Sequence, residues 1–115
     1  MIILDFETNS SNEHDVIEVA ALKVELKNGK YILKDKFHRY YLSRYLVEFK
    51  NHFCTMKENK KIVKALNKNG KIKNPKLLEV CEYYGIKFDR SSHHSAIYDV
   101  TKTYEILICM NESKL

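Results

Sequence analysis

The chain has no long apolar run, no cysteine-rich motif, no internal repeat and no low-complexity linker. No stretch approaches the roughly 20 apolar residues that span a bilayer, so we expect no transmembrane segment and no membrane partner. The start, MIILDFE, has no basic region and soon reaches two acids, so we expect no signal peptide and a cytoplasmic protein. At 115 residues, the whole chain, 1–115, is expected to form one domain.

The cysteines also exclude two classes of protein. Cys54, Cys81 and Cys109 are odd in number and lie far apart, with no CxxC or Cys/His cluster. This pattern fits neither a disulfide framework nor a zinc site. We therefore expect three reduced thiols that serve as packing residues.

Positive charge is in excess and unevenly distributed. The formal net charge is +5, and residues 57–76 contain eight lysines against one acid, Glu58. Such a basic stretch suits a nucleic-acid backbone, but it also fits an ordinary solvated helix and loop. If nucleic acid binds here, we expect its contacts from the first lysines of the stretch, which are Lys57, Lys60, Lys61 and Lys64.

The first part of the sequence predicts an antiparallel meander. Residues 2–7 form a short apolar run, 16–26 are rich in β-branched and aliphatic residues, and about 31–42 continue this character. The pair Asn28-Gly29 between the last two segments is typical of a tight hairpin.

The second part predicts helices. Thr55 and Glu58 fit a capping box, followed by Ile62, Val63 and Leu66 at helical spacing. A second helix is predicted to begin at Asn74-Pro75, with Asn74 as its cap, and to end at Gly85. Its apolar stripe consists of Leu77, Leu78, Cys81 and Tyr84. The last helix, about Ser95 to Met110, has one predicted core-facing side, formed by Ile97, Val100, Tyr104, Leu107 and Ile108.

Two acids stand on the first predicted strand. Asp5 and Glu7 are two residues apart, so their side chains leave the same face, while Leu4 and Phe6 are expected to enter apolar packing on the other face. Neighbouring carboxylates repel one another unless a cation lies between them, and hard ions such as Mg²⁺ or Mn²⁺ prefer such oxygens. An isolated pair of this kind is more often an exposed strand end without a function, so a second cluster is needed.

A second cluster precedes the last helix, in His93-His94-Ser95-Ala96-Ile97-Tyr98-Asp99. Asp99 falls in the first turns of that helix, and His94 lies just before it. The cluster offers a third carboxylate and an imidazole whose ordinary pKa near 6.5 suits a general base. These groups are the ones that metal-assisted phosphodiester hydrolysis requires.

The two clusters together resemble the DEDDh 3′→5′ exonucleases, a family with the ribonuclease H-like fold. Leu4-Asp5-Phe6-Glu7-Thr8 is similar to the family's first motif, and His94 through Asp99 is similar to its third. Residues 16–21 look like the strand that usually follows the first motif, and residues 77–85 look like the helix and turn before the third. The family includes the epsilon proofreading subunit of bacterial DNA polymerase III and ribonuclease T.

The resemblance implies an α/β fold, with a ribonuclease H-like sheet, an antiparallel N-terminal meander and C-terminal helices. It implies that Asp5, Glu7 and Asp99 bind metal, with two Mg²⁺ or Mn²⁺ ions in an intact site, and that His94 deprotonates the attacking water. Thr8 would help to seat the terminal nucleotide. The implied reaction is hydrolysis of the last phosphodiester at a single-stranded 3′ end, in DNA or RNA, releasing nucleoside 5′-monophosphates.

The sequence departs from the family in its middle. The family has a middle motif with an Asn and an Asp at a helix start, and this chain lacks it. Residues 41–44 run almost directly into residues 49–55, which indicates an internal deletion around residues 43–54. The deletion removes at least one helix and the fourth carboxylate, so it affects the second metal and the packing of one sheet face.

Three interpretations remain open at this point. The chain is an active exonuclease, a catalytically defective remnant that binds nucleic acid or a partner, or a deletion product that folds poorly alone. The expected partner is a single-stranded nucleic-acid 3′ end. A polymerase complex, or a homodimer that covers the bare sheet face, would also fit the pattern.

Overall fold

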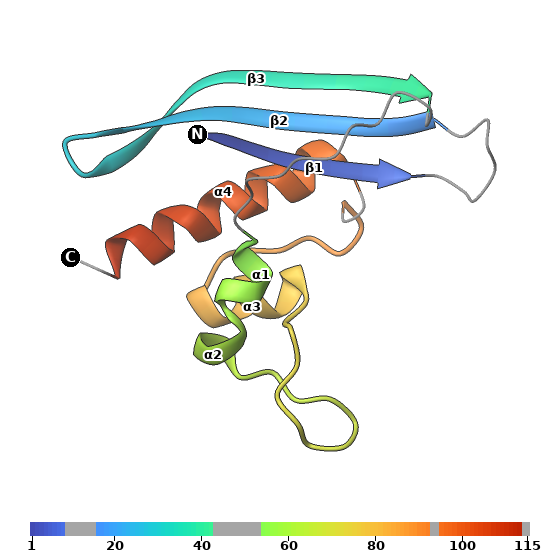
Figure 1. Ribbon diagram of the computed structural model, residues 1–115, viewed down its shortest axis with the longest axis vertical. Coiled ribbons are helices and arrows are strands. Elements are labelled where there is room, and N and C mark those ends of the chain that lie inside the picture. Colours follow the sequence, from blue (N-terminus) through green and yellow to red (C-terminus); the bar gives the residue numbers. More distant parts are fainter. Residues whose placement is uncertain (9–15, 43–53, 93–94, 114–115) are drawn as a thin grey trace.

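The computed structural model describes residues 1–8, 16–42, 54–92 and 95–113. The described residues form three strands followed by four helices. The strands are β1 (Ile2–Thr8), β2 (Val16–Lys27) and β3 (Lys30–Leu42), and the helices are α1 (Thr55–Glu58), α2 (Lys60–Val63), α3 (Leu77–Tyr84) and α4 (Ala96–Glu112). Figure 1 shows α4 lying across one face of the sheet and α1, α2 and α3 on the far side of α4. The predicted α/β class, with an antiparallel sheet and C-terminal helices, is confirmed.

The sheet is a simple meander in the order β1-β2-β3, with both neighbouring pairs antiparallel. The predicted hairpin between β2 and β3 is confirmed. Its turn places Asn28 at φ 53° and Gly29 at φ 77°, which are the left-handed conformations that Asn-Gly adopts readily in tight hairpins. This two-residue turn sets the register in which β2 pairs with β3, beginning with Lys27 opposite Lys30.

The main core lies between the sheet and α4. Alternate residues of β1 and β2 face the helix, and α4 contributes its own apolar side to the same cluster, which consists of Ile3, Ala20, Leu22, Val24, Ala96, Val100 and Leu107. Leu22 is almost completely buried, and burying a leucine side chain stabilises a fold by about 2 kcal/mol. This cluster attaches the C-terminal helix to the N-terminal strands.

Helix α4 also has a second buried side, which the sequence pattern did not predict. Ile106 and Met110 pack with Val80 and Cys81 of α3 in a separate cluster. At its edge the buried Asn59 donates hydrogen bonds to the Thr55 carbonyl (2.7 Å) and the Met110 sulfur (3.3 Å) and accepts one from the Tyr84 hydroxyl (2.7 Å). Since α4 is buried on two sides, it forms the middle layer of the molecule.

The predicted single helix after Thr55 is wrong. Cys54, not Thr55, is the N-cap residue of α1, and α2 ends at Lys64, which adopts a left-handed conformation at φ 54°. Leu66 is exposed and forms an isolated antiparallel bridge with Ile72. The left-handed residue ends the helix before Leu66 can join its apolar side.

The start of α3 also differs from its prediction. Lys76 is the N-cap residue in place of Asn74, because its N–H donates to the Glu79 carboxylate at 2.9 Å. The predicted end is confirmed: Gly85 adopts φ 71°, and the next N–H, of Ile86, reaches the Cys81 carbonyl at 2.8 Å. Three residues of the predicted stripe contribute to the cluster between α3 and α4, namely Leu77, Cys81 and Tyr84.

The structure bears on the cysteines and on membrane spanning as well. Cys54, Cys81 and Cys109 are all free thiols, as expected, and burial raises the pKa of Cys81 to about 11. Across the four described ranges no helix is both long and apolar enough to span a membrane. The deletion inferred around residues 43–54 lies outside the described residues except for Cys54.

Candidate functional site

The acids of β1 lie where α4 begins. Asp5 and Glu7 share the sheet face that carries the core, because Ile3 on the same strand and face belongs to the main cluster. The register places Ala20 beside Asp5 and Glu18 beside Glu7. Ala20 and the first residue of α4, Ala96, are completely buried, and two such small side chains let the helix approach the strands closely.

Asp99 approaches the same point from the helix. It lies in the first turn of α4, where its N–H donates to the Ser95 carbonyl at 2.9 Å, and its side chain is only 5% exposed. One carboxylate oxygen from each of Asp5, Glu7 and Asp99 lies within 4.8 Å of the other two. The structure therefore brings together three acids from opposite ends of the sequence.

Burial and the neighbouring acids both disfavour the ionised form of Asp5. Burial, followed by the charges of Asp99, Glu7 and Glu18, raises the pKa of Asp5 to about 7. Its Oδ2 atom is buried and accepts no hydrogen bond from the described residues. An anionic cluster with an unused buried oxygen has the donor type and the charge that a hard divalent cation prefers.

A fourth acid, Glu18 of β2, lies next to this cluster but is held by other groups. Its Oε1 accepts a hydrogen bond from the N–H of Ala96, and its Oε2 accepts bonds from His38 Nε2 (2.7 Å) and from the Tyr40 hydroxyl (3.1 Å). Burial opposes ionisation of Glu18, but these hydrogen bonds outweigh it and lower its pKa. Because no side chain from its own segment caps α4, Glu18 caps the helix from the neighbouring sheet.

The sequence analysis gave no role to Glu18 or to His38. One signal was present for Glu18. Glu18 lies an even number of residues before Leu22 and Val24 on the same strand, so alternation predicts that its carboxylate faces the core side of the sheet. A charged residue on an otherwise apolar strand face needs polar partners, and His38, Tyr40 and Ala96 are those partners.

The predicted separation of Leu4 and Phe6 from the acids, on the opposite face of β1, is confirmed. Both residues point away from the acids, as alternation requires, but Phe6 remains 37% exposed. No described helix or strand lies over that face of the sheet (Figure 1). The apolar cluster under β1 instead contains Ile3, on the same face as the acids.

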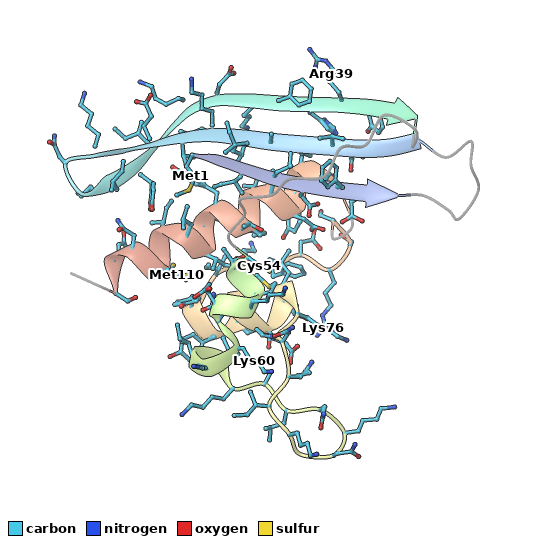
Figure 2. All side chains as sticks on the ribbon, viewed as in Figure 1. Met1, Arg39, Cys54, Lys60, Lys76 and Met110 are labelled. Atoms are coloured by element: carbon cyan, nitrogen blue, oxygen red, sulfur yellow. The ribbon has the colours of Figure 1, made fainter. Side chains whose placement is uncertain are left out.

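Other predicted site residues lie apart from the acids or outside the description. His94 is outside the described residues. Thr8 is the last residue of β1, and only its backbone is described. Lys57, Lys60, Lys61 and Lys64 are exposed on or directly after α1 and α2. Figure 2 shows Lys60 on the layer furthest from the sheet, so these lysines do not join the acidic cluster.

Comparison with known proteins gives no assignment. No protein-family model matches the chain, and no curated protein or solved structure matches it either. The geometry of the acids is therefore the observation from which a function can be argued.

The acid cluster predicts an unusual pH dependence of stability for metal-free protein. The pKa of Asp5 rises from 3.8 to about 7 on folding, so between these values the unfolded chain is ionised at Asp5 while the folded chain keeps the proton. Its contribution to stability therefore falls as pH rises through this window. We expect Asp5→Asn to be about 1–2 kcal/mol more stable than wild type at pH 8, a value discounted for solvent screening.

This difference corresponds to a rise in Tm of about 5–10 °C, which thermal melts in a chelator would measure. At pH 3.5 the difference should nearly vanish, because both states are then largely protonated. The matched control Glu82→Gln changes an exposed acid on α3 and should leave Tm unaltered at both pH values. A destabilised Asp5→Asn variant at pH 8 would show that the carboxylates do not repel one another.

Proposed function

We propose that this chain is a metal-dependent 3′→5′ exonuclease of the DEDDh type, built on a reduced ribonuclease H-like fold. The observation that carries the proposal is the meeting of Asp5, Glu7 and Asp99 within 4.8 Å. Two of these acids come from the first strand and one from the first turn of the last helix. This is the placement that the resemblance of the two sequence motifs implies.

The residues present fit a divalent metal. Asp5, Glu7 and Asp99 would hold Mg²⁺ or Mn²⁺, and the buried oxygen of Asp5 that accepts no hydrogen bond from described residues supports this assignment. When bound, such an ion supplies charge stabilisation for a phosphoryl group and a more acidic water. The positive charge of the ion would stabilise the ionised form of Asp5, whose pKa is raised by burial and by the other acids.

His94 completes the proposed set as the general base. In the sequence it directly precedes Ser95, the N-cap residue of α4, and the Ser95 carbonyl accepts the N–H of Asp99. An imidazole near neutral pKa at this point would take the proton from the water that attacks the terminal phosphodiester. Thr8, at the end of the strand that carries Asp5 and Glu7, would contact the terminal nucleotide.

A second function is supported by a different observation. The described residues contribute three carboxylates to the cluster, and the sequence lacks the middle motif that supplies the fourth in the family. The exposed lysines of α1 and α2 remain. This combination favours a catalytically defective remnant that still binds nucleic acid, as the alternative to an active enzyme.

One assay separates the two functions. Purified protein is incubated with a single strand labelled at its 3′ end, in DNA and RNA forms, with Mg²⁺, Mn²⁺ or a chelator. The exonuclease is expected to release labelled nucleoside 5′-monophosphate with either metal and none with the chelator. Salt-dependent binding of the strand without release of a mononucleotide would support the remnant and reject the enzyme.

The lysines of α1 and α2 predict the salt dependence of binding. Replacing Lys57, Lys60, Lys61 and Lys64 by glutamine is expected to weaken single-strand binding about ten- to a hundredfold at low salt. Each lost phosphate contact lowers the magnitude of the slope of log K against log salt by about 0.7. Fluorescence anisotropy across a salt series measures both quantities.

The matched control makes the same change of charge on the sheet hairpin, at Lys27, Lys30, Lys34 and Lys36, which are exposed. If net charge alone drives binding, both quadruple variants lose affinity equally. If α1 and α2 form the binding surface, the hairpin variant keeps most of the wild-type affinity and slope.

A further inference from the structure

The segment between α2 and α3 carries two exposed aliphatic side chains next to each other. Leu66 and Ile72 pair in an isolated antiparallel bridge, and residues 65–73, which contain this bridge, are called here the basic hairpin. Leu66 is 59% and Ile72 47% exposed. Figure 1 shows this segment projecting from the layer of the molecule that lies furthest from the sheet.

Main-chain hydrogen bonds hold the aliphatic pair side by side. The N–H of Asn67 donates to the Lys71 carbonyl, and the N–H of Lys73 donates to the Ala65 carbonyl, both at 2.9 Å. These bonds flank the pair, so its two residues are a non-hydrogen-bonded pair, in which the Cα atoms are about 4.5 Å apart and the side chains lie close together. The pair therefore presents one continuous apolar surface.

The turn ahead of the aliphatic pair is polar and is held by its own hydrogen bonds. The side-chain oxygen of Asn67 accepts the N–H groups of Asn69 (2.9 Å) and Lys71 (3.0 Å). Gly70 adopts φ 77°, a conformation that glycine reaches without the cost that a side chain would add. The apolar surface thus lies behind an ordered, polar tip.

Positive charge surrounds the aliphatic pair. The sequence contains no acid between residues 59 and 78, and Lys68 and Lys71 are exposed in and directly after the turn. Lys73 lies 2.7 Å from the Glu79 carboxylate of α3, so it attaches the hairpin to that helix. The basic hairpin therefore offers an apolar surface and positive charge to the same ligand.

A single-stranded nucleic acid fits this combination. Its phosphates attract lysine, and its unpaired bases offer apolar faces, and in thymine a methyl group, that aliphatic side chains can cover. An anionic lipid surface fits less well, because the tip with Lys68 and Asn69 would have to enter the hydrocarbon before the aliphatic pair, and burying such groups is costly. A nucleic-acid strand can instead lie along the side of the hairpin.

We propose that the basic hairpin binds the bases of a single-stranded nucleic acid through Leu66 and Ile72. Lys68 and Lys71 contact the phosphates on either side. The choice of nucleic acid as the ligand rests on the proposed function. Because the hairpin projects from the layer furthest from the sheet, it holds a part of the strand away from the 3′ end that reaches the acids.

The test measures binding by fluorescence anisotropy in a chelator, so that no strand is cleaved. The probes are a thymidine strand of about 20 nucleotides and an abasic strand of the same length, which keeps the phosphates but has no bases. The variant Leu66→Thr/Ile72→Thr removes the apolar surface, and a cross-strand pair of threonines suits a hairpin. It should bind the thymidine strand about five- to thirtyfold more weakly than wild type, and the abasic strand equally well.

The lysines of the hairpin should show the opposite pattern. Lys68→Gln/Lys71→Gln should bind both strands more weakly. The slope of log K against log salt should fall in magnitude by about 1.4, at about 0.7 for each lost phosphate contact. The threonine variant should keep the wild-type slope, because an apolar contact releases no counterions.

The matched control is Leu26→Thr/Ile32→Thr, which changes two aliphatic residues of similar exposure, 59% and 41%, on the sheet hairpin. It should bind both strands as wild type does. Hydrogen exchange at the N–H groups of Asn67 and Lys73 checks that the basic hairpin stays folded in the threonine variant.

Three results would overturn the proposal. Equal weakening of the threonine variant on both strands would mean that the aliphatic pair only supports the hairpin. Equal binding of the two strands by wild type would exclude base contacts without any variant. Binding to vesicles with anionic lipid that depends on Leu66 and Ile72, in place of strand binding, would assign the hairpin to a membrane surface. Since the chelator prevents hydrolysis, the release of mononucleotides remains a separate test of the exonuclease.

Discussion

Asp99→Asn is expected to reduce metal-dependent 3′→5′ hydrolysis about a thousandfold without unfolding the chain. The substitution keeps the shape of a side chain that is almost fully buried and keeps its main-chain hydrogen bond to Ser95. It removes one of the three charges that meet at the site. Losing one electrostatic contact to a transition state commonly costs a factor of about 10²–10³, and loss of a metal ligand acts on the same quantity.

The same substitution should stabilise the metal-free protein at alkaline pH. After burial, the charge of Asp99 is the largest cause that raises the pKa of Asp5. Without that charge, the pKa of Asp5 moves back towards its ordinary value, and ionisation of Asp5 opposes folding less. A variant that is more stable and less active is the signature of an acid retained for function.

Rates with Mg²⁺ and with Mn²⁺, together with melts in a chelator at pH 8, measure the two effects. Glu112→Gln is the matched control, because it changes an exposed acid at the far end of the same helix. Full activity in Asp99→Asn would mean that the nuclease signal comes from a contaminant or from another site. The proposed function would then be rejected.

Local sequence signals were sufficient for the sheet. The three strands and the Asn28-Gly29 turn were predicted within one or two residues, because alternation and turn preferences act over a few neighbouring positions. The placement of Asp5 and Glu7 on one face follows from the same alternation. Their meeting with Asp99 could be expected only through the resemblance of the two motifs, since no local rule joins β1 to α4.

The helical region shows where local signals fail. Thr55 and Glu58 fit a capping box, yet Cys54 occupies the N-cap position without a side-chain capping bond, and α2 ends at the left-handed Lys64. Asn59, which separates α1 from α2, is held by Tyr84 and Met110, which lie 25 and 51 residues away in the sequence. A buried polar group takes whichever partners the tertiary fold presents, and a pattern of apolar spacing does not contain those partners.

Glu18 is a second case, and it has consequences for the proposed activity. Its hydrogen bond to Ala96 joins residues 78 positions apart. Alternation along β2 places the Glu18 side chain on the core side of the sheet. Only the fold shows that it caps the helix that carries Asp99. We therefore expect it to act as a positioning residue.

Glu18→Ala is expected to lower stability by about 2 kcal/mol and activity about ten- to a hundredfold. The variant loses three hydrogen bonds from a side chain that is 14% exposed, to Ala96, His38 and Tyr40, and bonds to a charged group contribute more than neutral ones. The first turn of α4 then lacks its cap. A displacement of about 1 Å at Asp99 is enough to cost a factor of about a hundred in rate.

Three measurements distinguish positioning from metal binding and from fold stability alone. With Asp5, Glu7 and Asp99 intact, Glu18→Ala should need more Mg²⁺ for half-maximal rate and should recover much of its activity at high Mg²⁺. Asp99→Asn should not recover. Glu25→Ala, on the same strand but exposed and paired with Lys34, should match wild type in rate and Mg²⁺ requirement.

The conservative variant Glu18→Gln gives the sharpest distinction. Its amide oxygen can still accept the N–H of Ala96, so the cap and most of the activity should be retained, while the charge is lost. If Glu18 bound the metal directly, Glu18→Gln would instead be as inactive as Asp99→Asn. If Glu18 only stabilised the fold, both Glu18 variants would have wild-type rates well below their melting temperatures, because the acids would stay in place.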